Sequence, residues 1–94
     1  MEKTAFKAVV SGTVQGVGYR YFASREASLF DITGYVKNLP DGRVEVFAEG
    51  RREELDQFLA KLRRGPRFGH VKDLEIEWLD YEGRFRKFGI ESGY

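Results

Sequence analysis

The feature that most constrains this chain is a change of hydrophobic period across a short segment that contains Gly16 and Gly18. Residues 5–13 alternate between two faces, with period two, as a β-strand does. Residues 19–30 instead follow the period of an amphipathic helix. The apolar stripe of that helix contains Tyr19, Phe22, Ala23, Ala27, Leu29 and Phe30. The chain therefore begins with a strand, a glycine-containing loop and a helix.

The same two periods recur along the rest of the chain. Residues 32–38 and 43–49 read as strands, and Pro40, Asp41 and Gly42 between them are typical of a hairpin turn. Residues 53–64 carry a helical stripe that ends at Gly65 and Pro66. Residues 74–78 alternate as a fourth strand, and residues 85–90 indicate a short last strand.

The order β-α-β-β-α-β predicts a single α+β domain over residues 1–94, with the ferredoxin-like arrangement. We expect a four-stranded antiparallel sheet, plus the short C-terminal strand, covered on one face by two helices. Right-handed crossovers put the first strand beside the third, and the hairpin puts the second strand on its other side. The loop at residues 14–19 and Asn38 can then lie at the same end of the sheet.

Composition limits the partners of such a domain. The net charge is +1, with 16 Lys and Arg against 15 Asp and Glu, which argues against a nucleic-acid surface. The chain has no cysteine and no run of membrane-spanning length, so we expect a cytoplasmic monomer without membrane or nucleic-acid partners. High charge with few amide side chains also favours a heat-adapted source.

The loop itself indicates an anion site. Gly16 and Gly18 allow close approach to the backbone, and the following helix directs its positive end at the loop. Arg20 adds a planar fork that matches phosphate or carboxylate, and a cation at a helix start opposes the dipole unless an anion binds there. The residues alone therefore predict a pocket for inorganic phosphate or a similar anion.

Three motifs then resemble one known family. The segments Val14-Gln15-Gly16-Val17-Gly18-Tyr19-Arg20, Gly34-Tyr35-Val36-Lys37-Asn38 and Asp41-Gly42-Arg43-Val44-Glu45 resemble the acylphosphatases in sequence and spacing. Gly65-Pro66 and Phe88-Gly89-Ile90 extend the likeness over nearly the whole chain. The resemblance implies hydrolysis of the carboxyl–phosphate bond of small acyl phosphates, with no metal or organic cofactor.

The resemblance also implies which residues act. Arg20 and the backbone of the loop would bind the phosphoryl group, and Asn38 would hold the attacking water. The implied substrate-binding residues are Gln15, Gly16, Val17, Gly18, Tyr19 and Arg20, and the implied catalytic residues are Arg20 and Asn38. Tyr19 departs from the phenylalanine of many members, with no expected consequence for the chemistry.

The alternative is a non-catalytic ferredoxin-like module that binds a regulatory anion or RNA. The third strand has one aromatic residue, Phe47, with Glu45 and Glu49 beside it, which weighs against RNA. By its spacing Tyr21 is predicted to belong to the core rather than to a ligand site, and His70 is predicted to be exposed.

Overall fold

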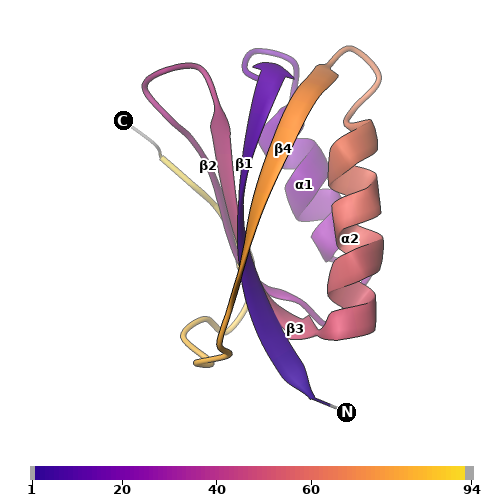
Figure 1. Ribbon diagram of the computed structural model, residues 1–94. Helices are drawn as coiled ribbons and strands as arrows, with labels where there is room; N and C mark the ends of the chain where they lie inside the picture. The colour runs from indigo at the N-terminus through magenta and orange to yellow at the C-terminus, as the bar shows by residue number, and fades with distance from the viewer. Residues whose placement is uncertain (1, 93–94) are drawn as a thin grey trace.

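The computed structural model describes residues 2–92, and it confirms the predicted element order (Figure 1). The strands and helices are β1 (Lys3–Thr13), α1 (Tyr19–Ala27), β2 (Thr33–Asn38), β3 (Val44–Arg51), α2 (Arg52–Arg64), β4 (His70–Leu79) and β5 (Phe88–Glu91). Neither helix of the described residues is long and apolar enough to cross a membrane.

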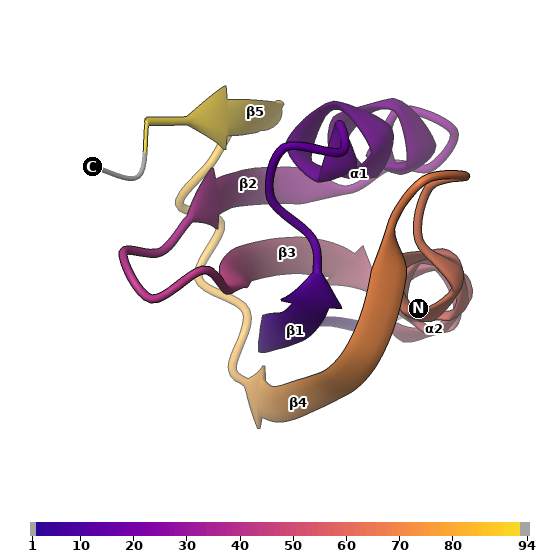
Figure 2. The same ribbon diagram turned by 90° about the horizontal axis from the view of Figure 1, so that it is seen from above.

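The strands form one twisted sheet in the order β4-β1-β3-β2-β5. All neighbouring pairs are antiparallel except β2 and β5, which run parallel. Both helices pack on the same face of the sheet, α1 over β2 and β5, and α2 over β1, β3 and β4 (Figures 1 and 2). This is the predicted ferredoxin-like α+β arrangement, extended by the fifth strand.

The core lies between the sheet and the helices. Alternation along β1 and β3 puts one residue in two on the helix side, and α2 contributes the stripe predicted from its period. The fully buried residues of these elements include Phe6, Ala8, Val10, Val44, Val46, Ala48, Leu55, Phe58 and Leu62. Glu53 and Glu54 at the start of α2, and Arg63 and Arg64 at its end, complement the helix dipole.

Several predicted boundaries are wrong. The fourth strand begins at His70 rather than at residue 74, and the last strand begins at Phe88 rather than at residue 85. The first helix ends at Ala27 rather than at residue 30, because the chain tightens into a turn in which Phe30 donates to the carbonyl of Ala27. Leu29 is consequently 68% exposed instead of extending the apolar stripe. The third strand also does not stop at Gly50 but continues to Arg51, since β1 pairs with it over the full length.

The face opposite the helices is crossed by the connection between β4 and β5, residues 80–87, which joins strands at opposite edges of the sheet. Glu49 in β3 is 1% exposed and anchors this connection. Its carboxylate accepts hydrogen bonds from the backbone N–H groups of Glu82, Gly83 and Arg84, at 2.8, 3.1 and 3.1 Å. The ring of Phe85 packs against those of Tyr35 and Phe47.

Replacing Glu49 by alanine is expected to lower the free energy of unfolding by about 3 kcal/mol, because three backbone donors lose a charged acceptor. Urea unfolding measures the change. The matched control is Glu75→Ala, since Glu75 is exposed on β4 and its loss is expected to change stability by less than about 0.5 kcal/mol. Equal losses in the two variants would show that the anchor does not stabilise the fold.

Candidate active site

The site lies where β1 and β2 end, and the pairing of β3 brings these two strand ends together. β1 and β2 are both antiparallel to β3, so they run in the same direction and end at the same edge. The loop of residues 14–18 follows β1, and Asn38 is the last residue of β2. The two sequence motifs, which are separated by a whole helix, therefore meet in space, as the sequence analysis predicted.

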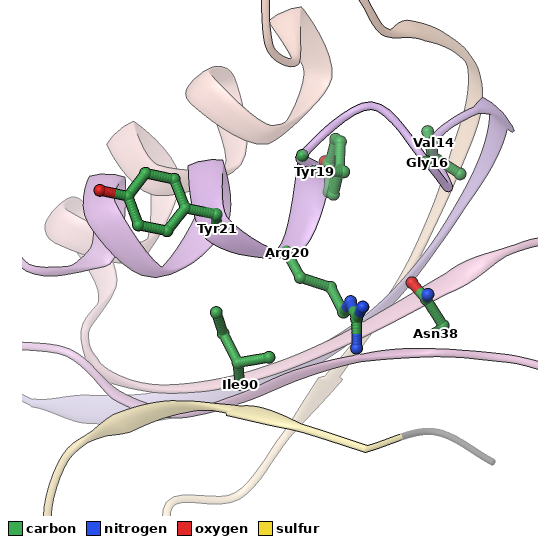
Figure 3. Close-up of a pocket in the computed structure, with 8 residues that line it drawn as sticks. Val14, Gly16, Tyr19, Arg20, Tyr21, Asn38 and Ile90 are labelled. Atoms are coloured by element: carbon green, nitrogen blue, oxygen red, sulfur yellow. The ribbon is translucent and has the colours of Figure 1, made fainter.

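A pocket of about 230 Å³ lies between the loop, the start of α1 and the end of β2 (Figure 3). The residues that line it are Val14, Gly16, Gly18, Tyr19, Arg20, Tyr21, Asn38 and Ile90. Five of the seven predicted site residues are among them. The two that are not, Gln15 and Val17, lie in the same loop.

The loop backbone has the conformation that its glycines permit. Gly16 and Gly18 have φ of 77° and 78°, in the left-handed region that disfavours residues with a Cβ. A Cβ added at either would meet no atom within 4 Å, so the space beside both is open. Gly18 is also the N-cap of α1, and no side chain caps that helix. The first N–H groups of an α-helix lack intrahelical acceptors and carry the positive end of its dipole, and the first residues of α1, Tyr19 and Arg20, line the pocket.

Arg20 supplies the charge of the pocket. It is half-buried, and it forms no ion pair with any carboxylate among residues 2–92. Figure 3 shows its side chain extending across the pocket with the guanidinium toward Asn38. A guanidinium held in a pocket without a carboxylate partner offers its planar fork to an anionic ligand.

Asn38 presents a buried acceptor to the same pocket. Its Oδ1 atom is buried and accepts no hydrogen bond from the described residues. An unsatisfied buried polar atom costs about 1–3 kcal/mol of stability, so its presence at a pocket indicates a ligand that donates to it.

The side chain of Gln15 points away from the pocket and bonds to the hairpin, while a substrate-binding role for its backbone stays a prediction. Its side-chain Nε2 donates to the carbonyl oxygens of Leu39 and Arg43, each at 2.9 Å. These carbonyls belong to the β2–β3 hairpin immediately after Asn38, so Gln15 joins the glycine loop to the strand end opposite it. No local sequence signal reveals this bridge, because it links residues 24 and 28 positions apart.

Tyr19 and Val17 likewise turn inward. The side chain of Tyr19 is 1% exposed, and its hydroxyl donates to the carbonyl oxygen of Leu62 in α2 at 2.8 Å. Burial raises the pKa of that hydroxyl, which keeps it protonated as a donor. Val17 packs against the core. The hydroxyl of Tyr19, which the phenylalanine of many members lacks, therefore joins the two helices next to the pocket.

Sequence reasoning missed three residues of the pocket: Val14, Tyr21 and Ile90. Tyr21 was predicted to be core, which is wrong, since its side chain is 66% exposed. The signal was available, because two residues of α-helix rotate a side chain by about 200° and so place Tyr21 opposite the buried Tyr19. Ile90 reaches the pocket only through the pairing of β5 with β2, which its local sequence does not encode.

Among the described residues, neither a histidine nor a metal-binding cluster contributes to the pocket. His70 is exposed, as predicted, and it does not line the pocket. Within residues 2–92 no group of three or more His, Asp or Glu side chains is arranged to hold a metal ion.

The fold and the pocket together define a ferredoxin-like α+β protein with an arginine- and glycine-lined site at the ends of two strands. The sequence matches the acylphosphatase family model over residues 6–90. An acylphosphatase of Thermus thermophilus is 51% identical over 76 residues, which cover 81% of this chain and 86% of the relative. That of Methylococcus capsulatus is 48% identical over 82 residues, covering 87% and 89%.

A solved structure agrees with the sequence relatives. The crystal structure of the acylphosphatase from Bacillus subtilis superimposes with a TM-score of 0.90 at 36% identity, covering 94% of this chain and 98% of that one. The chain therefore belongs to the acylphosphatase family, and it is an enzyme that hydrolyses acyl phosphates. The predicted family and enzyme class are therefore confirmed, and the alternative of a non-catalytic binding module is not supported.

Gly18→Ala is expected to abolish most of the stabilisation that phosphate gives the protein. At about ten times its dissociation constant, phosphate is expected to stabilise the unaltered protein by about 1.4 kcal/mol in urea unfolding. The variant also loses about 1 kcal/mol of stability without phosphate, because alanine disfavours the left-handed backbone.

Gly42→Ala is the matched control. Gly42 lies in the hairpin, has φ of 95° and open space around an added Cβ, and does not line the pocket. This variant is expected to lose similar stability and to keep the full effect of phosphate. If phosphate stabilised both variants equally, the loop would not be the anion site.

Proposed function

We propose that Arg20 and the backbone N–H groups of residues 15–20 bind the phosphoryl group of an acyl phosphate, and that Asn38 orients the attacking water. The observation that carries this proposal is that two groups without partners among residues 2–92 meet in one pocket of about 230 Å³: the Arg20 guanidinium and the buried amide oxygen of Asn38. The phosphoryl group of the substrate is an anionic partner for the guanidinium, and the attacking water is a donor for the amide oxygen.

The reaction asks little covalent chemistry of the protein. The water oxygen forms a bond to phosphorus while the bond from phosphorus to the carboxyl oxygen breaks. The bonding pair leaves with the carboxylate, and the products are a carboxylate and dihydrogen phosphate. Because a carboxylate is a good leaving group, positioning and charge neutralisation supply most of the rate enhancement.

Charge neutralisation falls to Arg20 and the loop. The equatorial oxygens of the phosphoryl group carry the negative charge, and they meet the guanidinium fork on one side and the start of α1 on another. These donors are held in place before substrate arrives, since Gln15 and Tyr19 fasten the loop and the helix start to the hairpin and to α2. Preorganised donors of this kind stabilise developing charge without reorganisation during the reaction.

Asn38 contributes position rather than basicity. An amide does not titrate near neutral pH, but its Oδ1 atom accepts a hydrogen bond from water. No carboxylate and no imidazole lines the pocket within residues 2–92, so the proton of the attacking water passes to a phosphoryl oxygen of the substrate. The water is thereby held in line without a general base from the protein.

Arg20→Ala is expected to raise the inhibition constant of phosphate and to lower kcat/KM for benzoyl phosphate by about a thousandfold, because it removes the fixed charge of the pocket. Phosphate release is followed in the presence of EDTA, which is expected to leave the rate of the unaltered enzyme unchanged. Arg20→Lys keeps the charge but not the fork, and is expected to recover only part of the loss. Unchanged phosphate inhibition in Arg20→Ala would exclude the binding role.

Asn38→Ala is expected to lower kcat by about a hundredfold, because the water loses its orientation, while the inhibition constant of phosphate stays within about twofold. The free energy of unfolding is expected not to fall, since the change removes an unsatisfied buried acceptor. Steady-state kinetics and urea unfolding measure both effects. A variant with weakened phosphate inhibition and an unchanged kcat would contradict the water-holding role.

A further inference from the structure

Two large apolar side chains are exposed at the mouth of the pocket. Tyr21 is 66% exposed and Ile90 is 47% exposed, and both line the pocket. They come from different elements, α1 and β5, that the fold brings to one place. The polar chemistry of the site, proposed above, makes no use of either. An exposed apolar pair beside a reactive centre indicates contact with an apolar part of a ligand.

The two apolar residues lie on the same side of Arg20. In Figure 3, Tyr21 and Ile90 are on one side of Arg20, and Asn38 is on the other side, beyond the guanidinium. The pocket therefore has a polar end, formed by Asn38 and the glycine loop, and an apolar end, formed by Tyr21 and Ile90.

Tyr21 makes a cation–π contact with Arg25, one helical turn further along α1. The guanidinium of Arg25 lies over its ring, 5.8 Å from the centroid, and Arg25 lines a neighbouring cavity that Tyr21 also borders. Arg25 does not line the pocket of Arg20 and Asn38, so its contact with Tyr21 leaves that pocket open.

Ile90 is placed by the sheet. It pairs with Val36 in the parallel ladder of β2 and β5, two positions before Asn38 on β2. The ladder thus fixes Ile90 relative to the residue that holds the water.

The geometry of in-line displacement predicts which end of the pocket faces which part of the substrate. The attacking and leaving oxygens lie on opposite sides of phosphorus, roughly in a line. If Asn38 holds the water, the carboxylate must leave in the direction away from Asn38. In Figure 3, Tyr21 and Ile90 lie on the side of Arg20 away from Asn38.

We propose that Tyr21 and Ile90 form the acyl subsite, contacting the group attached to the carboxyl carbon and favouring acyl phosphates with an aromatic or extended apolar acyl group. The proposal rests on the proposed roles of Arg20 and Asn38. Acyl groups that carry a second carboxylate are disfavoured, because these two side chains give a charge no partner. Since both residues are largely open to solvent, the preference is modest, about fivefold in kcat/KM from the apolar area covered.

The test compares kcat/KM for benzoyl phosphate with that for acetyl phosphate. In Tyr21→Ala and Ile90→Thr the ratio is expected to fall about fivefold, while kcat/KM for acetyl phosphate and the inhibition constant of phosphate stay within about twofold. Ile90→Thr keeps a β-branched residue in the edge strand, so the ladder is retained. The control is Leu29→Ala, since Leu29 is 68% exposed, follows α1 and lies outside the pocket.

Three results would overturn the subsite: an unchanged ratio in both variants, an equal loss with both substrates, or an equal fall of the ratio in Leu29→Ala. A second readout needs no turnover. Benzylphosphonate is expected to raise the unfolding temperature more than methylphosphonate does, and Tyr21→Ala is expected to remove the difference. Failure of the unaltered enzyme to hydrolyse either substrate would contradict the proposed function, while the phosphonate comparison would still decide the subsite.

Discussion

The structure depends on the pairing of β3 with antiparallel neighbours on both sides. That pairing makes β1 and β2 run the same way, so the glycine loop and Asn38 are held at one edge although they are far apart in sequence. The hydrogen bonds of Gln15 to the hairpin then fix the distance between the two. The site is therefore a consequence of sheet topology, with the local sequence adding only the final side chains.

Much of this could be predicted, because the informative signals were local. Each of these signals spans only a few residues. They are the hydrophobic periods of two and 3.6, the turn at Pro40-Asp41-Gly42 and the helix stop at Gly65-Pro66. The handedness of the crossover connections and the hairpin then gave the order of the first three strands. The shared pocket of Arg20 and Asn38 follows from that order, while their chemical roles and the heat-adapted source stay predictions.

What could not be predicted depends on contacts between distant residues. The buried carboxylate of Glu49 looks like an ordinary outward-facing acid in the sequence, since its partners are backbone groups more than thirty positions away. The parallel pairing of β5 is equally invisible, and with it the place of Ile90. The hydroxyl of Tyr19 has meaning only once the end of α2 lies beside it.

Two buried side-chain oxygens accept no hydrogen bond from the described residues, Asn38 Oδ1 in the pocket and Glu26 Oε1 outside it. Other polar groups have partners. Lys37 pairs with Glu45, and Glu49 accepts three hydrogen bonds. Among residues 2–92 Arg20 has no carboxylate partner and Asn38 Oδ1 has no donor, which lowers stability at the pocket where, in the proposed reaction, substrate and water supply these partners.

The short strand β5 also affects how readily the sheet pairs with the sheet of another molecule. An uncovered β2 would present a row of backbone donors and acceptors next to Asn38, and such an edge invites pairing with another chain. The four residues of β5 cover that edge, and the other edge, β4, carries alternating charged side chains such as Glu75 and Glu77. The strand that contributes Ile90 to the pocket thus replaces the longer edge of β2 with an edge of only four residues, and short edge strands limit pairing with other chains.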